Sequence, residues 1–133
     1  MILQQMSWEE VETYLATRDD AVLPVGSTEQ HGPIGLIGTD ALCATAVAEG
    51  ASARAGAIML PPVPYTPAPF NMGFPGTISV SEASFTALVS DIIAALATHG
   101  FRRLYVVNAH GANLAPLKAL AGEAPLSMRI RSW

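Results

Sequence analysis

Charged residues, cysteines and long apolar runs are all scarce in this 133-residue chain. Only 14% of the residues are charged, and a net charge of −4 without a basic cluster argues against nucleic acid as a partner. A single cysteine, Cys43, excludes an internal disulfide and is typical of a reducing cytoplasm. No apolar run reaches the roughly 18–20 residues of a transmembrane helix, and residues 1–8 lack the features of a signal peptide. We therefore expect a cytoplasmic protein with no membrane partner.

Apolar residues, by contrast, make up half of the chain, and the mean hydropathy is +0.35. This surplus indicates a large core or a buried interface. The hydrophobic pattern predicts strands at 21–26, 57–60, 103–108 and 127–133, and helices at 7–15, 41–54, 80–99 and 114–120. Their alternation predicts one α/β domain over residues 1–133, in three layers, with a mostly parallel sheet and helices on both faces.

Capping residues predict where these helices begin and end. The expected starts are two capping boxes and two single caps; these are Ser7 with Glu10, Ser79 with Glu82, Thr39, and Asn113. The expected ends are glycines, at Gly56, Gly100 and Gly122. The clearest apolar stripe belongs to the third helix and is predicted to be core; it consists of Phe85, Leu88, Val89, Ile92, Ile93 and Leu96.

Metal-ligating side chains are concentrated just after the first strand. Glu29 and His31 are two positions apart, so extended backbone puts both side chains on one face. Asp40 opens the next helix and points back toward them, and His110 follows another strand. Sites in open α/β sheets form at the carboxyl ends of strands. Carboxylate and imidazole together suit zinc, manganese or iron(II), and an Asp can bridge two ions.

The same residues also have a plain structural interpretation. Glu29 would then be a solvated loop carboxylate, Asp40 a helix-end charge and His31 a hydrogen-bonded loop histidine. Cys43 lies one helical turn after Asp40, and we interpret it as a small buried hydrophobe in preference to a ligand. Metal binding and this alternative both remain open at this point.

A proline-rich loop spans residues 61–76 and carries the aromatic residues Tyr65, Phe70 and Phe74. Long loops in compact domains are usually functional or disordered, and the aromatics argue against disorder. We interpret the loop as a wall of a pocket, with a surface-wrapping loop or an oligomer contact as the alternative. Asn71 and Thr77 are its candidate substrate-pocket residues.

Five segments, in order, resemble the creatininase (creatinine amidohydrolase) family. They are LPVGSTEQHGP at 23–33, GTD at 38–40, FPGTIS at 74–79, GFRR at 100–103 and NAHGAN at 108–113. The resemblance implies an α/β fold with a binuclear metal centre and hydrolysis of cyclic or linear amide bonds. It also implies that Glu29 and His110 hold one ion and His31 the other, with Asp40 bridging. Asn108 and Asn113 would support His110 and orient it without binding the metal themselves.

The resemblance further implies a divalent cofactor, expected to be zinc, with manganese or iron as alternatives. It implies a small-molecule amide substrate and a homo-oligomer, often a hexamer in this family. Two departures stand out: creatininase proper has a glutamate where this chain has Ala112, and relatives are nearly twice as long. We therefore interpret residues 1–133 as the N-terminal half of the family fold, and assign no general base within it.

Two further functions remain open. One is a non-catalytic or inactive truncated family member that acts as a metal-binding or assembly module. The other, which rests on fold analogy alone, is a flavodoxin-like nucleotide or flavin binder, although no glycine-rich phosphate loop follows a strand.

Overall fold

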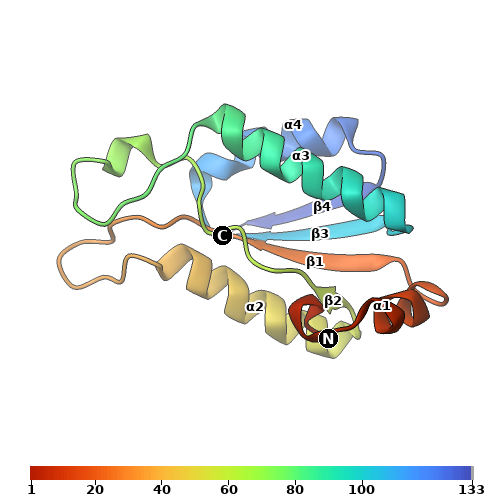
Figure 1. Cartoon of the computed structure of the whole chain (residues 1–133). Helices are drawn as coiled ribbons and strands as arrows, with labels where there is room; N and C mark the ends of the chain where they lie inside the picture. Colours follow the sequence, from red (N-terminus) through yellow and green to blue (C-terminus); the bar gives the residue numbers. More distant parts are fainter. Residues whose placement is uncertain (133) are drawn as a thin grey trace.

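A computed structural model describes residues 1–132 and contains four α-helices and four strands within them (Figure 1). The helices are α1 (Trp8–Leu15), α2 (Thr39–Ala55), α3 (Glu82–His99) and α4 (Leu114–Glu123). The strands are β1 (Asp20–Val25), β2 (Ile58–Met59), β3 (Arg103–Asn108) and β4 (Ser127–Ser132). Short 3-10 turns occur at Leu3–Gln5, Pro69–Asn71 and Gly111–Asn113. Trp133, the expected last residue of β4, lies outside the described residues.

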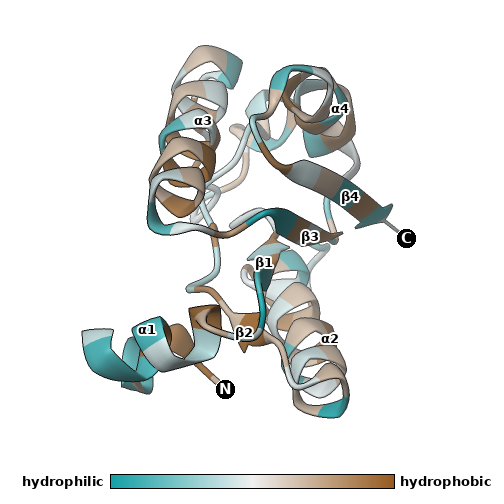
Figure 2. Cartoon of the chain, turned by 90° about the vertical axis from the view of Figure 1, so that its right-hand side faces the viewer, coloured by the Kyte–Doolittle hydropathy of each residue, from teal (hydrophilic) through white to brown (hydrophobic). Residues whose placement is uncertain are grey.

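The four strands form one parallel sheet in the order β2-β1-β3-β4. Helix α2 covers one face, whereas α3 and α4 cover the other (Figures 1 and 2). β1 and β3 are the central pair and align over six residues, from Asp20 opposite Arg103 to Val25 opposite Asn108. The predicted three-layer α/β fold is therefore confirmed. Within residues 1–132, no helix combines the length and apolar character needed to cross a membrane.

Several predicted helix boundaries are confirmed. The backbone N–H of Glu10 donates to Ser7 Oγ at 3.3 Å and the backbone N–H of Ser7 donates to Glu10 Oε2 at 2.7 Å, which completes the capping box of α1. Gly56 and Gly100 follow α2 and α3 with φ of 65° and 103°. Both glycines are therefore left-handed C-caps, a conformation that side chains with a Cβ rarely adopt.

Other boundary predictions are wrong. Ser81, not Ser79, caps α3 by accepting from the backbone N–H of Ser84 at 3.0 Å. The Ser79 hydroxyl instead accepts from the backbone of the proline-rich loop, at Ala68. A local sequence pattern does not show such a long-range partner, so it cannot decide which of two serines two positions apart caps the helix.

Three further corrections concern single residues. Thr39 is the first helical residue of α2, and Gly38 occupies the N-cap position. Asn113 does occupy the N-cap position of α4, but its side chain makes no capping hydrogen bond. Gly122 does not end α4, which continues to Glu123. Helix ends depend on one or two residues of tertiary contact, which propensity alone does not encode.

The core is unequal on the two faces of the sheet. On the α3 side the large, fully buried side chains include Phe85, Ile93, Leu104 and Leu117. On the α2 side small residues, such as Ala44 and Ala48, let the helix approach the sheet closely. Cys43 on α2 is exposed, so its interpretation as a buried hydrophobe is wrong.

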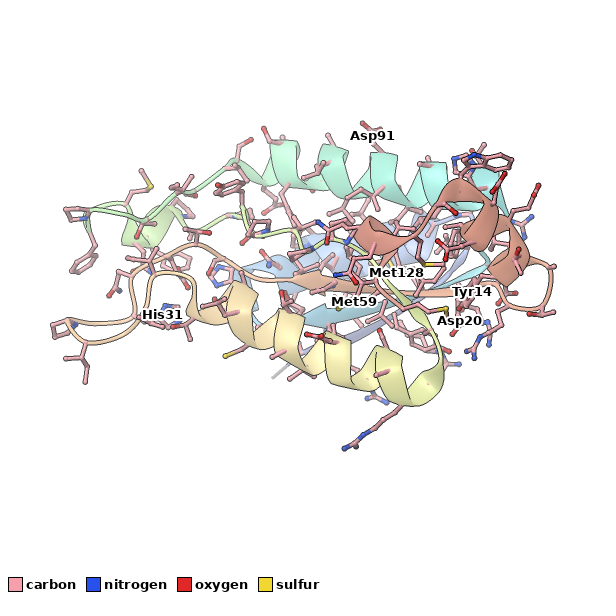
Figure 3. All side chains as sticks on the ribbon, turned by 60° about the horizontal axis from the view of Figure 1, so that its bottom comes forward. Tyr14, Asp20, His31, Met59, Asp91 and Met128 are labelled. Atoms are coloured by element: carbon pink, nitrogen blue, oxygen red, sulfur yellow. The ribbon has the colours of Figure 1, made fainter. Side chains whose placement is uncertain are left out.

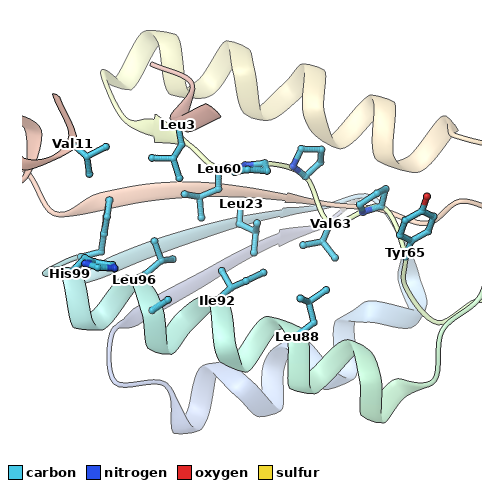
Figure 4. A pocket seen from close by; sticks show the side chains of 15 residues that line it. Leu3, Val11, Leu23, Leu60, Val63, Tyr65, Leu88, Ile92, Leu96 and His99 are labelled. Carbon is cyan, nitrogen blue, oxygen red and sulfur yellow. The ribbon is translucent and has the colours of Figure 1, made fainter. Parts of the chain in front are cut away.

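The apolar stripe of α3 is only partly core. Phe85, Val89, Ile93 and Leu96 are buried, but Leu88 is 47% exposed. Leu88 lines an apolar cavity of about 490 Å³ between α3 and the chain that follows β2 (Figure 4). The helical period identified the apolar face correctly, but nothing in it shows which part of that face lacks a partner.

Candidate metal centre

The candidate ligands lie at the carboxyl ends of the two central strands. After β1 the chain crosses to β2 on one side, and it later returns to β3 on the other side. This change of direction leaves a crevice between the carboxyl ends of β1 and β3, where ligands bind in open α/β sheets. Glu29 lies four residues beyond β1 and His110 two residues beyond β3. The loops of this end project to the left of the sheet in Figure 1.

Gly26 allows Asp40 to reach this crevice. It directly follows β1, and a Cβ built at this position would overlap the backbone of Asp40 and Ala41. The first turn of α2 therefore packs directly on the end of β1. This close approach brings Asp40, in the first turn, beside Ser27 and the loop that carries Glu29 and His31.

The four predicted ligands converge. Glu29, His31 and Asp40 each offer a ligand atom, and these atoms lie within 4.8 Å of one another. Asp40 stands between the two histidines, with His31 Nε2 at 2.9 Å from Oδ1 and His110 Nδ1 at 3.0 Å from Oδ2. His110 Nδ1 also lies 3.0 Å from Glu29 Oε1. His110 thus closes the cluster on the side of Asp40 opposite His31.

Among the described residues, no lysine or arginine compensates the negative charge at this site. Glu29 and Asp40 are 6% and 8% exposed. Among the described residues, the ion-pair partners within 4.0 Å of either carboxylate are histidines, with no lysine or arginine. Buried carboxylates are costly unless they are paired or coordinate a metal. The charge balance therefore favours a bound cation.

The histidine orientations point to the same conclusion. His110 Nε2 lies 2.9 Å from the carbonyl of Pro67, and His31 Nδ1 lies 3.1 Å from that of Glu29. A carbonyl only accepts, so each of these nitrogens carries a proton. The other nitrogen of each ring faces carboxylate oxygens, which also only accept. An ion or a second proton must lie between, and this arrangement is usual for metal-bound histidine.

The environment also makes His31 more basic. Its hydrogen bond to the Glu29 carbonyl raises the pKa of His31, burial opposes this, and the Asp40 carboxylate raises it further. The site therefore stabilises positive charge at this position. Figure 3 shows His31 at the loop end of the molecule, far from Tyr14 and Asp20.

The two predicted supporting asparagines, Asn108 and Asn113, form hydrogen bonds next to His110. Asn108 Nδ2 donates to the carbonyl of His110 at 2.8 Å, and Asn108 Oδ1 accepts from Asn113 Nδ2 at 3.1 Å. Both asparagines are fully buried, so they fix the backbone that carries His110. Their predicted role, which is to orient His110 for metal binding, stays a prediction.

The proline-rich loop contacts the ligands directly. Asn71 Nδ2 donates to Glu29 Oε2 at 2.6 Å, and Thr77 Oγ1 accepts from the backbone N–H of Gln30 at 3.1 Å. The ring of Phe70 stacks on His110 with 6.0 Å between centroids. Asn71 is thus a partner of Glu29, and contact of Asn71 or Thr77 with substrate stays a prediction.

Ser27 is a contact that sequence reasoning missed. Its fully buried hydroxyl donates to Asp40 Oδ2 at 2.6 Å and lies 3.1 Å from His110 Nδ1. Its position two residues before Glu29 was the only local signal, because its partners are 13 and 83 residues away. Ala112, in the turn after His110, offers no ligand.

Comparison with known proteins identifies relatives over nearly the whole chain. The sequence model of the creatininase family, described as creatinine amidohydrolase, matches residues 4–130. A creatinine amidohydrolase of Pseudomonas putida is 38% identical over 82% of this chain and 44% of its own length. A mycofactocin precursor peptide peptidase of Mycolicibacterium smegmatis is 36% identical over 84% and 47%. A 3-dehydro-scyllo-inosose hydrolase of Thermotoga maritima is 33% identical over 81% and 35%. The chain therefore spans about half or less of these relatives.

Solved structures of creatininases have the same fold as this chain. A creatinine amidohydrolase superimposes with a TM-score of 0.89 at 32% identity, over 98% of this chain and 57% of that one. A creatininase described with manganese gives a TM-score of 0.86 at 33% identity, and a mutant creatininase of Zn–Zn type gives 0.82 at 34%. Both cover 98% of this chain and 57% of the solved one.

Proposed function

This chain belongs to the creatininase family, and from that premise we propose that it forms the metal-binding part of a metal-dependent amidohydrolase. The reaction would be hydrolysis of the C–N bond of a cyclic or linear amide in a small-molecule or peptide substrate. The curated relatives are named for three different substrates, so membership of the family does not choose among them.

One observation carries the proposal. Two buried carboxylates and two histidines meet at the carboxyl ends of the central strands, with no lysine or arginine beside them among the described residues. In each imidazole one nitrogen donates to a backbone carbonyl and the other faces carboxylate oxygens. This donor set of oxygen and nitrogen suits zinc, with manganese or iron(II) as alternatives.

The positions of the oxygens support a binuclear assignment. Glu29, His110 and Asp40 would hold one ion, since Glu29 Oε1, His110 Nδ1 and Asp40 Oδ2 face one another. His31 and Asp40 would hold the other, with Asp40 shared between the two. Ions held there would lower the pKa of a bound water toward 7 and would polarise the scissile carbonyl.

The other residues of the site shape its surroundings. The ring of Phe70 covers one face of His110, and the Pro67 carbonyl fixes the tautomer of that histidine. Asn71 donates to Glu29 Oε2 and leaves Oε1 for an ion. Ser27 donates to Asp40 Oδ2, the oxygen that also faces His110. No residue of this chain is assigned the general base.

A non-catalytic metal-binding or assembly module is the second candidate. It is favoured by the unequal ligand sets, because the His31 side has two protein ligands and the turn after His110 contributes only Ala112. This candidate predicts at most one ion per chain and no turnover.

Metal content, measured on the purified chain together with native mass, tests the proposal. We expect close to two zinc, manganese or iron ions per chain, and hydrolysis of at least one member of a panel of cyclic amides, linear amides and peptides. Glu29→Gln and His110→Ala should abolish both. Glu82→Gln, on the exposed first turn of α3, is the matched control and should change neither. Full hydrolysis after removal of all metal would overturn the proposal, and one ion without turnover would favour the module.

A further inference from the structure

A chain of side-chain amides links the proline-rich loop to one of the candidate ligands. Asn71 Nδ2 donates to Glu29 Oε2 at 2.6 Å, and Gln30 Nε2 donates to Asn71 Oδ1 at 2.9 Å. Gln30 Oε1 in turn accepts from the backbone N–H of Gly32 at 2.8 Å. The chain of bonds therefore runs from the turn at Gly32 to the carboxylate of Glu29.

The direction of every bond in this chain is fixed by its two ends. The N–H of Gly32 only donates, so Gln30 must present its oxygen there and its NH₂ to Asn71. A carboxylate only accepts, so Asn71 must present its NH₂ to Glu29. One amide orientation satisfies both ends at once, which removes the usual ambiguity between amide oxygen and nitrogen.

We propose that Asn71 is a positioning residue that aims the carboxylate of Glu29 at a divalent ion, with Gln30 holding Asn71 in place. The proposal rests on the proposed metal centre and deepens it. With Oε2 occupied by Asn71, rotation of the carboxylate is restrained and Oε1 faces His110 Nδ1 at 3.0 Å. Because Asn71 is neutral, it orients the carboxylate without cancelling the charge that a cation needs.

The loop around Asn71 is built to hold this position. Asn71 ends the 3-10 turn Pro69–Asn71, and prolines at 67 and 69 fix their own φ angles. Pro67 accepts from His110 Nε2, and Phe70 stacks on the same ring at an interplanar angle of 19°. Three residues within five positions of the chain therefore contact two candidate ligands of one ion, so that ion binding and the position of the loop are coupled.

The test is the zinc dissociation constant of the full chain, measured by competition with a chromophoric chelator. Asn71→Leu keeps the size of the side chain and removes its donor, and we expect the dissociation constant to rise about 10–100-fold. Gln30→Leu should raise it by a smaller factor. The double variant should match Asn71→Leu alone, because Gln30 acts through Asn71. Asn71→Gln retains an NH₂ donor and should recover part of the affinity.

Phe74→Leu is the matched control, since it changes an exposed side chain three residues further along the same loop. It should leave the dissociation constant unchanged. Visible spectra of the cobalt-loaded chain supply a second measurement, and the cobalt bands should shift in Asn71→Leu and not in Phe74→Leu.

The outcomes separate this inference from the proposed function. A wild-type chain that binds zinc, with Asn71→Leu binding equally well, would overturn the role of Asn71 and leave the metal centre standing. A lower melting temperature of the metal-free Asn71→Leu variant with unchanged zinc affinity would show a structural role and would also overturn it. A wild-type chain that binds no divalent ion would overturn both.

Discussion

At the scale of single residues, Gly26 decides whether the site can assemble. A Cβ at this position would overlap the backbone of Asp40 and Ala41, so Gly26→Ala must push α2 away from β1. We expect a loss of about 1–3 kcal/mol of unfolding free energy, together with weaker metal binding because Asp40 moves. Chemical denaturation and metal content measure the two effects.

Gly50 offers the matched control for this prediction. It lies within the same helix, is exposed, and has nothing within 4 Å of a built Cβ. Gly50→Ala should therefore stabilise the chain by roughly 0.5–1 kcal/mol, since alanine favours helix. Equal effects of the two substitutions would contradict the close approach of α2 to β1.

The candidate ligands could be predicted from the sequence, whereas the long-range contacts that support them could not. Glu29, His31, Asp40 and His110 could be identified because their side-chain chemistry follows strand ends, and the structure brings them together. The bond between Asn71 and Glu29 spans 42 positions, and a serine or asparagine has no chemistry that singles it out from its surroundings. Such supporting contacts are visible only after the loops are placed.

At the scale of elements, Asp20 of β1 contacts side chains of α1 and β3 at the end of the sheet opposite the candidate metal centre. It is 4% exposed and accepts from Arg18 Nη2 at 2.8 Å and from the Tyr14 hydroxyl at 3.0 Å. Burial raises the pKa of the Asp20 carboxyl, but the hydrogen bonds from Arg18 and Tyr14 and the charges of Arg18 and Arg103 outweigh burial and lower it. The charged form is therefore the one that stabilises the fold.

The pH dependence of stability follows from this direction. Because the pKa is lower in the folded state, the contribution of Asp20 is complete above the ordinary Asp value of about 3.9. It is lost as the pH falls through the lower folded value. At pH 7, Asp20→Asn should cost about 1–3 kcal/mol of unfolding free energy. Urea denaturation at a series of pH values gives the unfolding free energy as a function of pH. In Asp20→Asn the acid limb of this curve, between about pH 2 and 5, should be flatter than in the wild type.

Asp91 is the control carboxylate for this measurement. It is exposed on α3 and forms no ion pair among the described residues, and Figure 3 shows it on the outer side of that helix. Asp91→Asn should leave both the stability at pH 7 and the acid limb nearly unchanged. An acid limb in Asp20→Asn as steep as that of the wild type would assign the pH dependence to other groups.

Elements were the most predictable level of this chain, because each has a local cause. The apolar run of β3 and the capping box of α1 both occur where the pattern places them. The errors came from contacts between elements. Ser79 bonds to the proline-rich loop instead of capping α3, and Leu88 lines a cavity although its period is that of the core. Period and propensity describe one element at a time, so they do not determine its neighbours.

At the scale of the whole molecule, the site end is apolar and nearly free of charge. Residues 61–81 contain no Asp, Glu, Lys or Arg. Large apolar side chains are nevertheless exposed there, with Ile34 96%, Leu36 67%, Phe70 65% and Phe74 54% exposed. An exposed apolar cluster of this kind marks an interaction surface, and we expect it to contact a second copy of the chain.

Native mass spectrometry and light scattering test this expectation, because an oligomer gives a multiple of the 13.9 kDa chain mass. Ile34→Asp puts a charge on this surface without changing a candidate ligand. It should raise the dissociation constant of the oligomer at least about tenfold, so that the measured mass moves toward that of the monomer. Glu9→Gln on α1, at the opposite end of the sheet, should leave the mass unchanged. If Ile34→Asp leaves the mass unchanged as well, the apolar end is not the contact between copies. A wild type that is monomeric at micromolar concentration would contradict the oligomer contact, and the interpretation of the loop as a pocket wall would be favoured.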